Sequence, residues 1–102
     1  MTFGEFYDFC IALSNEEPVT PFDPNTLVFK KTGKIFALTN AERFEFINLK
    51  CLPEDAIELR TNFIAIRPGY HMNKKHWNSV YVNQDVPDQL IFQLIKTSFN
   101  LV

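Results

Sequence analysis

Long apolar runs and cysteines are both scarce in this chain of 102 residues. No apolar run approaches the roughly 20 residues that a membrane-spanning helix needs, so we expect no membrane association. The two cysteines, Cys10 and Cys51, share no C-x-x-C spacing and lie among apolar neighbours. This context predicts two buried, reduced thiols and no disulfide. The first ten residues lack the basic start of a signal peptide, and we therefore expect a cytoplasmic location.

Charges of one sign are missing from two stretches of the sequence. The first 25 residues contain no Lys or Arg, and no Asp or Glu lies between Glu58 and Asp85. The formal net charge is −2, whereas nucleic-acid-binding domains are usually strongly basic. Binding to a polyanion would therefore depend on a local patch, and the acid-free stretch is where such a patch is expected.

Motifs for catalysis and metal binding are also absent. The chain has no G-x-S-x-G, no P-loop and no G-x-G-x-x-G. His71 and His76 are five residues apart, and no third or fourth ligand lies near them in the sequence. We expect no metal, no cofactor and no enzymatic activity. An enzyme or ligand-binding domain would instead need a closed pocket that brings His71 or His76 against a carboxylate.

Hydrophobic periodicity and turn residues predict eight elements. A capping box at Thr2 and Glu5 begins the first helix, Gly33 allows a tight hairpin turn, and Pro53 and Pro87 mark helix starts. The expected elements are a helix over 2–14, strands over 26–31, 34–39 and 43–50, a helix over 53–62, strands over 64–67 and 79–83, and a helix that starts within 85–89 and runs to the C-terminus.

The order α-β-β-β-α-β-β-α predicts an α+β fold for a single domain over residues 1–102. Clustered strands with helices between and around them favour a two-layer domain, with one antiparallel sheet and the helices on one face. The other face of the sheet would then be partly open to a partner.

The segment 66–81, IRPGYHMNKKHWNSVY, interleaves cations with aromatic residues and permits three interpretations. Its cations could contact phosphates while Tyr70 or Trp77 stacks on bases. Alternatively, its aromatics belong to the core and its lysines to a solvated turn; for Trp77 itself we expect burial in the core. As a third possibility, Tyr, Trp and Arg suit a protein-docking surface. A second basic cluster, Lys30, Lys31 and Lys34, lies at the expected hairpin tip and could grip a backbone.

The run RPGYHMNKKHWNSVYVNQDVPDQLIFQLIKTSFNLV resembles the signature of the MmcQ/YjbR family, and LVFKKTGKIFAL and INLKCLPEDAIELR follow the family's order upstream. The resemblance covers essentially the whole chain. It implies a compact α+β fold, likened to frataxin-type and secretion-chaperone-type domains, and a DNA-binding function described as a double-wing motif. The matching positions are Lys50, Arg67, Pro68, Gly69, Tyr70, His71, Met72, Asn73, Lys74, Lys75, His76 and Trp77.

Our main hypothesis is a small non-enzymatic domain that binds DNA through the basic-aromatic segment and the basic hairpin. The alternative is a protein-interaction or chaperone-like module, suggested by the acidic first helix, the Phe-rich strands and the open sheet face. That alternative loses its main support if the apolar side chains of strands 26–49 are buried. The candidate nucleic-acid-binding residues are Lys30, Lys31, Lys34, Lys50, Arg67, Tyr70, His71, Lys74, Lys75, His76 and Trp77.

Overall fold

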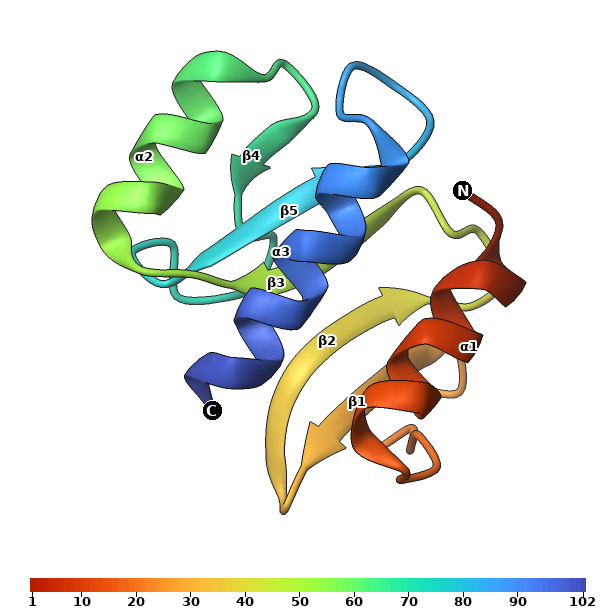
Figure 1. Cartoon of the computed structure of the whole chain (residues 1–102). Helices are drawn as coiled ribbons and strands as arrows, with labels where there is room; N and C mark the ends of the chain where they lie inside the picture. The colour runs from red at the N-terminus through yellow and green to blue at the C-terminus, as the bar shows by residue number, and fades with distance from the viewer.

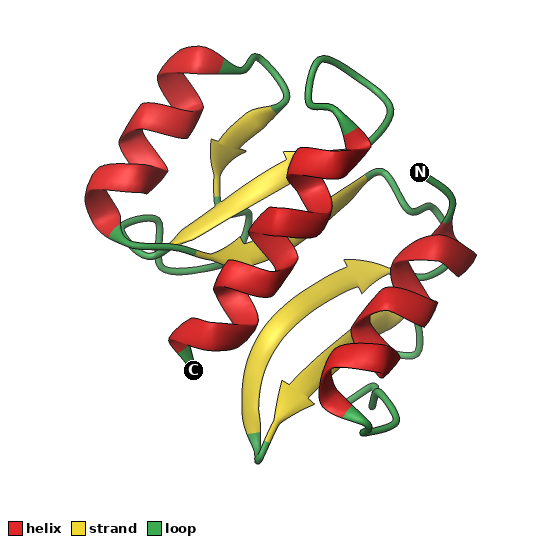
Figure 2. Ribbon diagram, in the orientation of Figure 1, coloured by secondary structure: helices red, strands yellow, loops and turns green.

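A computed structural model describes all 102 residues and has the predicted element order (Figure 1). One antiparallel sheet carries its helices on one face, which confirms the α+β class (Figure 2). No helix combines the length and apolar character needed to cross a membrane. The elements are α1 (Phe3–Ser14), β1 (Thr26–Lys31), β2 (Lys34–Asn40), β3 (Phe46–Lys50), α2 (Pro53–Asn62), β4 (Ile66–Pro68), β5 (Trp77–Tyr81) and α3 (Asp88–Leu101).

The five strands lie in the order β1-β2-β3-β5-β4, and every neighbouring pair is antiparallel. The first three strands form a meander. The chain then passes through α2 to β4 at the far edge of the sheet and returns as β5 beside β3. The connection between β4 and β5, residues 69–76, therefore joins the ends of these two strands and carries the middle of the basic-aromatic segment.

The core lies between the sheet and the helices. Phe29, Ile47 and Val80 are buried on the helix-facing side of the sheet, and Phe6 and Ile91 are fully buried opposite them. Aromatic rings make up much of this contact, and the rings of Phe6 and Phe29 meet edge to face at 5.3 Å. Burial of large apolar side chains of this kind contributes roughly 1.5–3 kcal/mol each.

A β-bulge at Phe36 re-aims one large side chain into the core. The register passes from Phe29↔Ala37 to Lys30↔Ile35, so Phe36 has no partner in β1. The Ser98 hydroxyl of α3 donates to the Phe36 carbonyl at 2.5 Å and accepts from the Lys50 amide at 2.9 Å. Ser98 thereby bridges β2 and β3 beyond the last pair of their ladder, and it satisfies backbone groups that the curved strand leaves free.

The capping box at the start of α1 is confirmed. The Thr2 hydroxyl accepts from the Glu5 amide at 3.1 Å, and the Glu5 carboxylate accepts from the Thr2 amide at 2.8 Å. These bonds lower the pKa of Glu5. Pro53 begins α2 at its first turn, as the sequence predicted.

Two strand boundaries differ from the prediction because non-glycine residues adopt positive φ. We expected a strand over 43–50, but β3 begins only at Phe46, since Phe44 has φ 46° and the Asn40 side chain holds a turn by accepting from the Arg43 amide. We expected a strand over 79–83, but β5 ends at Tyr81 and Asn83 has φ 58°. Nothing in the local composition marks Phe44 as a left-handed residue.

The fourth strand starts later than expected, whereas the last helix starts within the predicted stretch 85–89. The Asp85 carboxylate accepts from the Ile64 and Ala65 amides at 2.7 and 2.8 Å, so these residues form a turn and β4 begins at Ile66. The last helix begins at Asp88, with Pro87 as the residue before its first turn. Asp85 therefore ties the entry of β4 to the segment that leads into α3.

Candidate nucleic-acid interface

The face of the sheet opposite the helices forms the floor of a cleft of about 600 Å³. Leu38 of β2 and Asn48 of β3 are register partners and lie on this floor. Phe22, from the connection between α1 and β1, and Tyr70, from the connection between β4 and β5, both line the cleft. The open face that the sequence predicted is thus bordered by two connections that are distant in the sequence.

A buried polar pair fixes the loop 69–76 onto this face. The Ser79 hydroxyl accepts from the Tyr70 amide at 2.9 Å and donates to Asn48 Oδ1 at 2.5 Å. Asn48 Nδ2 in turn donates to the Tyr70 carbonyl at 3.1 Å. Both side chains are almost fully buried, so their hydrogen-bonding groups depend on the Tyr70 backbone for partners.

Gly69 allows the loop to approach β5 closely. Its amide donates to the Trp77 carbonyl at 2.9 Å. A Cβ at this position would lie 2.8 Å from Trp77 Cβ and 2.9 Å from the Trp77 carbonyl oxygen. Glycine is therefore needed here for space, and the unusual P-G-Y sequence serves in part to seat the loop.

Arg60 of α2 holds the same loop from the opposite side. Its Nε donates to Asn78 Oδ1 at 2.6 Å, and its Nη2 donates to the Lys74 carbonyl and, at 3.4 Å, to the Trp77 carbonyl. This guanidinium has its donors directed at the protein. Of the cations in the acid-free stretch, Arg60 has a structural role that the sequence did not reveal.

Four rings and one guanidinium form a continuous row across the open face, which we call the aromatic row: His71, Tyr70, Phe46, Tyr81 and Arg67. Neighbouring ring centroids are 4.1, 5.8 and 5.0 Å apart along the row, and the Arg67 guanidinium lies 4.7 Å from the Tyr81 centroid. Tyr70, the second member of the row, is 57% exposed, so its ring is accessible to a ligand.

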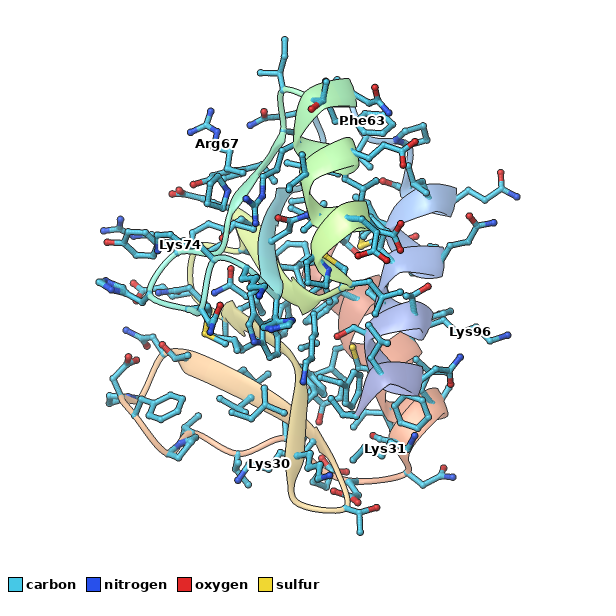
Figure 3. The ribbon with its side chains drawn as sticks, turned by 90° about the vertical axis from the view of Figure 1, so that its left-hand side faces the viewer. Lys30, Lys31, Phe63, Arg67, Lys74 and Lys96 are labelled. Carbon is cyan, nitrogen blue, oxygen red and sulfur yellow. The ribbon has the colours of Figure 1, made fainter.

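The loop that carries Tyr70 and His71 also carries Lys74 and Lys75. Figure 3 shows Arg67 and Lys74 on the side of the molecule away from the helices, whereas Lys96 of α3 points to the opposite side. Lys74 Nζ donates to the Gly69 carbonyl at 2.9 Å and keeps further donors free. The Lys75 side chain is exposed and has no hydrogen-bond partner within the protein.

The three lysines of the basic hairpin lie in different environments. Lys31 Nζ donates to the Phe99 carbonyl at 3.1 Å and lies 4.5 Å from the Phe99 ring centroid, so it serves the C-terminal turn of α3. The Glu16 carboxylate accepts from the Thr32 amide at 3.0 Å, which places a negative charge at the hairpin tip. Lys34 is exposed, and Lys30 points toward the open side (Figure 3).

The remaining candidates lie at the far end of β3 and β5. Trp77 pairs in register with Lys50 and is half-buried, outside the core cluster, so the expectation of a Trp77 core anchor was wrong. The reason is the alternation of β5, in which Asn78 and Val80 face the helices and Trp77 faces away. His76 accepts at its carbonyl from the Cys51 amide at 2.8 Å.

The site contains no ion pair, because the one salt bridge of the protein joins the Met1 amino group to Asp88. No three His, Cys, Asp or Glu side chains are grouped as metal ligands. Both cysteines are buried as predicted, and burial raises the pKa of the Cys10 and Cys51 thiols. His71 lines the cleft with Asp23 and Glu45 but makes no hydrogen bond to either carboxylate.

These features define a small α+β domain whose open sheet face carries a cleft, an aromatic row and a loop with free cations. A sequence model of the YjbR family matches residues 11–101. The chain belongs to the YjbR family.

Relatives in sequence and structure agree with this assignment. The chain is 47% identical over 83 residues to the uncharacterised protein YbdF of Escherichia coli O157:H7, covering 80% of this chain and 68% of YbdF. It is 32% identical over 100 residues to YjbR of Escherichia coli K12, covering 97% and 85% of the two chains. The crystal structure of Deinococcus radiodurans DR2400 superposes with a TM-score of 0.92 at 36% identity, covering 99% of this chain and 78% of that one. A Pseudomonas syringae protein structure gives 0.85 at 31% identity, covering 99% and 98%.

Proposed function

We propose that this protein binds single-stranded nucleic acid across the open face of its sheet. The observation that carries the proposal is the juxtaposition of the aromatic row with the free cations of the loop 69–76. Sequence-tolerant binding of single strands combines rings on which bases stack with cations that contact the phosphates. Tyr70 supplies the exposed ring, and Arg67 and Lys75 lie on either side of it in the sequence.

Four cations can contact phosphates on this side. Arg67 ends the aromatic row, Lys74 and Lys75 belong to the loop 69–76 that carries Tyr70, and Lys30 points to the same side from the hairpin (Figure 3). Neutralising about four phosphates of B-DNA gives a log–log salt slope of about −3.6, and the slope for a single strand is about −2.8. The affinity for a single strand should therefore fall by roughly 50-fold between 50 and 200 mM salt.

The geometry favours a single strand over a duplex. Stacking on Tyr70 requires the face of an unpaired base, and a duplex offers such faces only at its ends. The basic hairpin, which would act as a wing on a duplex, has Lys31 directed at α3 and Glu16 at its tip.

The alternative, a protein-interaction or chaperone-like module, has less support. Each apolar side chain of β1, β2 and β3 is buried or half-buried. Phe29 and Phe36 belong to the core, and Phe46 is half-buried in the lining of the cleft, so the Phe-rich strands present little exposed apolar surface. The most exposed aliphatic side chains, Ile57 and Ile64, lie on and just after α2, away from the strands that suggested this function.

Fluorescence anisotropy with labelled single- and double-stranded DNA across a salt series tests the proposal. We expect micromolar or tighter binding of the single strand with a steep salt slope, and weaker binding of the duplex. The Lys74→Glu/Lys75→Glu variant should lose most of this affinity. The matched control is Lys96→Glu, which changes an exposed lysine on the helix side and should bind as the unaltered protein does (Figure 3). No binding at 50 mM salt, or equal binding by both variants, would contradict the proposal.

A further inference from the structure

The cleft on the open face has the size and the unpaired groups of a specific ligand site. Its volume of about 600 Å³ falls within the roughly 300–1,000 Å³ typical of small-molecule sites. Four members of the aromatic row, His71, Tyr70, Phe46 and Tyr81, line this cleft, but stacking on their rings leaves its charged lining unexplained. The hydrogen-bonding state of its polar groups indicates what the interior would accept.

Several of the polar groups that line the cleft are already occupied by the protein. Asn48 uses both ends of its amide on Ser79 and Tyr70. The Asp23 carboxylate accepts from the Asn25 amide, the Thr26 amide and the Thr26 hydroxyl at 2.7–2.8 Å, and these bonds lower its pKa. Neither side chain has capacity to recognise a ligand strongly.

Three charged or polar side chains that line the cleft have no partner within the protein. Arg43, Glu45 and His71 make no side-chain hydrogen bond or ion pair. Arg43 lies in the turn that Asn40 holds. Because Asn40 Oδ1 accepts from the Arg43 amide at 3.0 Å, the backbone from which the Arg43 side chain extends is fixed. A guanidinium and an imidazole can donate to an anion, and the carboxylate can accept from an amino or imino group.

The apolar lining suits a planar ring. Tyr70 meets Phe46 edge to face at an interplanar angle of 84°, an arrangement in which Phe46 does not stack on the Tyr70 ring. Leu38, Phe46 and Tyr81 line the same cleft. A flat heterocycle could therefore contact Tyr70 while its attached groups reach the unpaired side chains.

From these observations we infer that the cleft holds one nucleobase together with an adjoining phosphate. The base lies against Tyr70, the phosphate accepts from Arg43, and Glu45 accepts from the base edge. If the nucleotide is part of a strand, this inference rests on the proposed function. A free nucleotide presents the same chemistry, and the experiment below distinguishes the two sources.

The test compares a thymidine oligomer of about eight nucleotides with an abasic oligomer of the same length, which keeps every phosphate and lacks every base. Stacking of one base predicts that the thymidine oligomer binds roughly 10-fold more tightly. Tyr70→Ala should remove this difference and leave the abasic affinity unchanged, whereas Tyr70→Phe should keep it because the ring is retained.

Arg43 and the free nucleotide provide a second measurement. In the ¹⁵N spectrum, thymidine monophosphate should shift the amides of Leu38 and Asn48 in the unaltered protein, and Arg43→Gln should weaken this response by at least about 5-fold. If the monophosphate shifts these amides and no oligomer binds, the cleft site stands with a free nucleotide as its ligand, and the proposed function fails.

The inference is overturned if thymidine and abasic oligomers bind equally and the monophosphate leaves the Leu38 and Asn48 amides unshifted. In that case salt-dependent binding that is lost in Lys74→Glu/Lys75→Glu would leave the proposed function intact. Thermal unfolding of each variant should match the unaltered protein within a few degrees, so a folding defect cannot imitate a lost ligand site.

Discussion

The two basic segments of this protein each contain a Lys-Lys pair but have different surroundings. The hairpin brings Lys30, Lys31 and Lys34 together, and the loop 69–76 carries Lys74 and Lys75. In the hairpin, Lys31 is directed at the end of α3 and Glu16 binds the tip. In the loop, Asn48 and Arg60 donate to backbone carbonyls and Ser79 accepts from the Tyr70 amide, while the Lys75 side chain has no partner within the protein.

The difference shows that a cluster of lysines does not define a binding site by itself. A cation whose partner is a helix carbonyl or a neighbouring carboxylate stabilises the fold, and it has less to offer a phosphate. A cation on a loop that is held by buried side chains is available without ordering the loop first. The loop is also the segment that carries Tyr70, so its cations and an exposed ring lie together.

The largest effect on the loop should come from Gly69→Ala. The added methyl group would meet Trp77 Cβ at 2.8 Å and its carbonyl at 2.9 Å, so the loop must move away from β5. We expect a loss of about 2 kcal/mol in the free energy of unfolding, measured by urea denaturation, and weaker nucleic-acid binding. Gly4→Ala is the matched control because its Cβ would have no neighbour closer than 3.9 Å, and it should be as stable as the unaltered protein or more so. Equal stability of the two variants would show that the loop is not seated by Gly69.

A smaller effect should come from Lys31→Met, which tests whether this hairpin lysine stabilises the fold. This change removes the charge near the C-terminus of α3 and the contact of the ammonium with the Phe99 ring. We expect a loss of about 1 kcal/mol in the free energy of unfolding, with the affinity for single-stranded DNA unchanged. Lys34→Met, at an exposed position of the same hairpin, should leave stability unchanged. A fall in affinity for Lys31→Met without loss of stability would show that Lys31 contacts DNA and does not stabilise the fold.

The smallest effect concerns Asp23, at the edge of the cleft. Hydrogen bonds from Thr26 and Asn25 lower the pKa of its carboxyl below the ordinary value of 3.8, so the ionised form is the one that the fold favours. Its contribution to stability is present above that ordinary value and is lost as the pH falls through the lowered pKa. Urea midpoints measured between about pH 6 and pH 2 should therefore fall less in Asp23→Asn than in the unaltered protein. Parallel curves would show that these bonds do not couple to folding.

Much of the fold could be predicted because its signals are local. The capping box at Thr2, the Gly33 hairpin and the prolines at helix starts each act within a few residues, and the structure confirms them. The strand boundaries could not be predicted in the same way. Phe44 adopts positive φ although nothing about its side chain favours that conformation, and the Asn at position 83, a residue type that tolerates positive φ, was not recognised as the end of the strand.

The candidate site could be predicted only in part. Tyr70 and His71 were identified from the basic-aromatic segment, and both line the cleft. Phe22 and Arg43 were missed because they reach the cleft from connections far away in the sequence. The polar Asn48 and Ser79, placed in otherwise apolar strands, were the available sign that something packs on the open face.

We propose that the loop 69–76, and not the hairpin, provides the main phosphate contacts. The most direct test compares Lys74→Glu/Lys75→Glu with Lys30→Glu/Lys34→Glu, each carrying the same change of charge, by anisotropy with single-stranded DNA across a salt series. We expect the loop variant to lose about 1.4 from the magnitude of the log–log slope and the hairpin variant at most about 0.7. Lys30 points to the open side (Figure 3), whereas Lys34 pairs in register with Lys31, which is directed at α3. Equal losses, or a larger loss in the hairpin variant, would contradict the proposal.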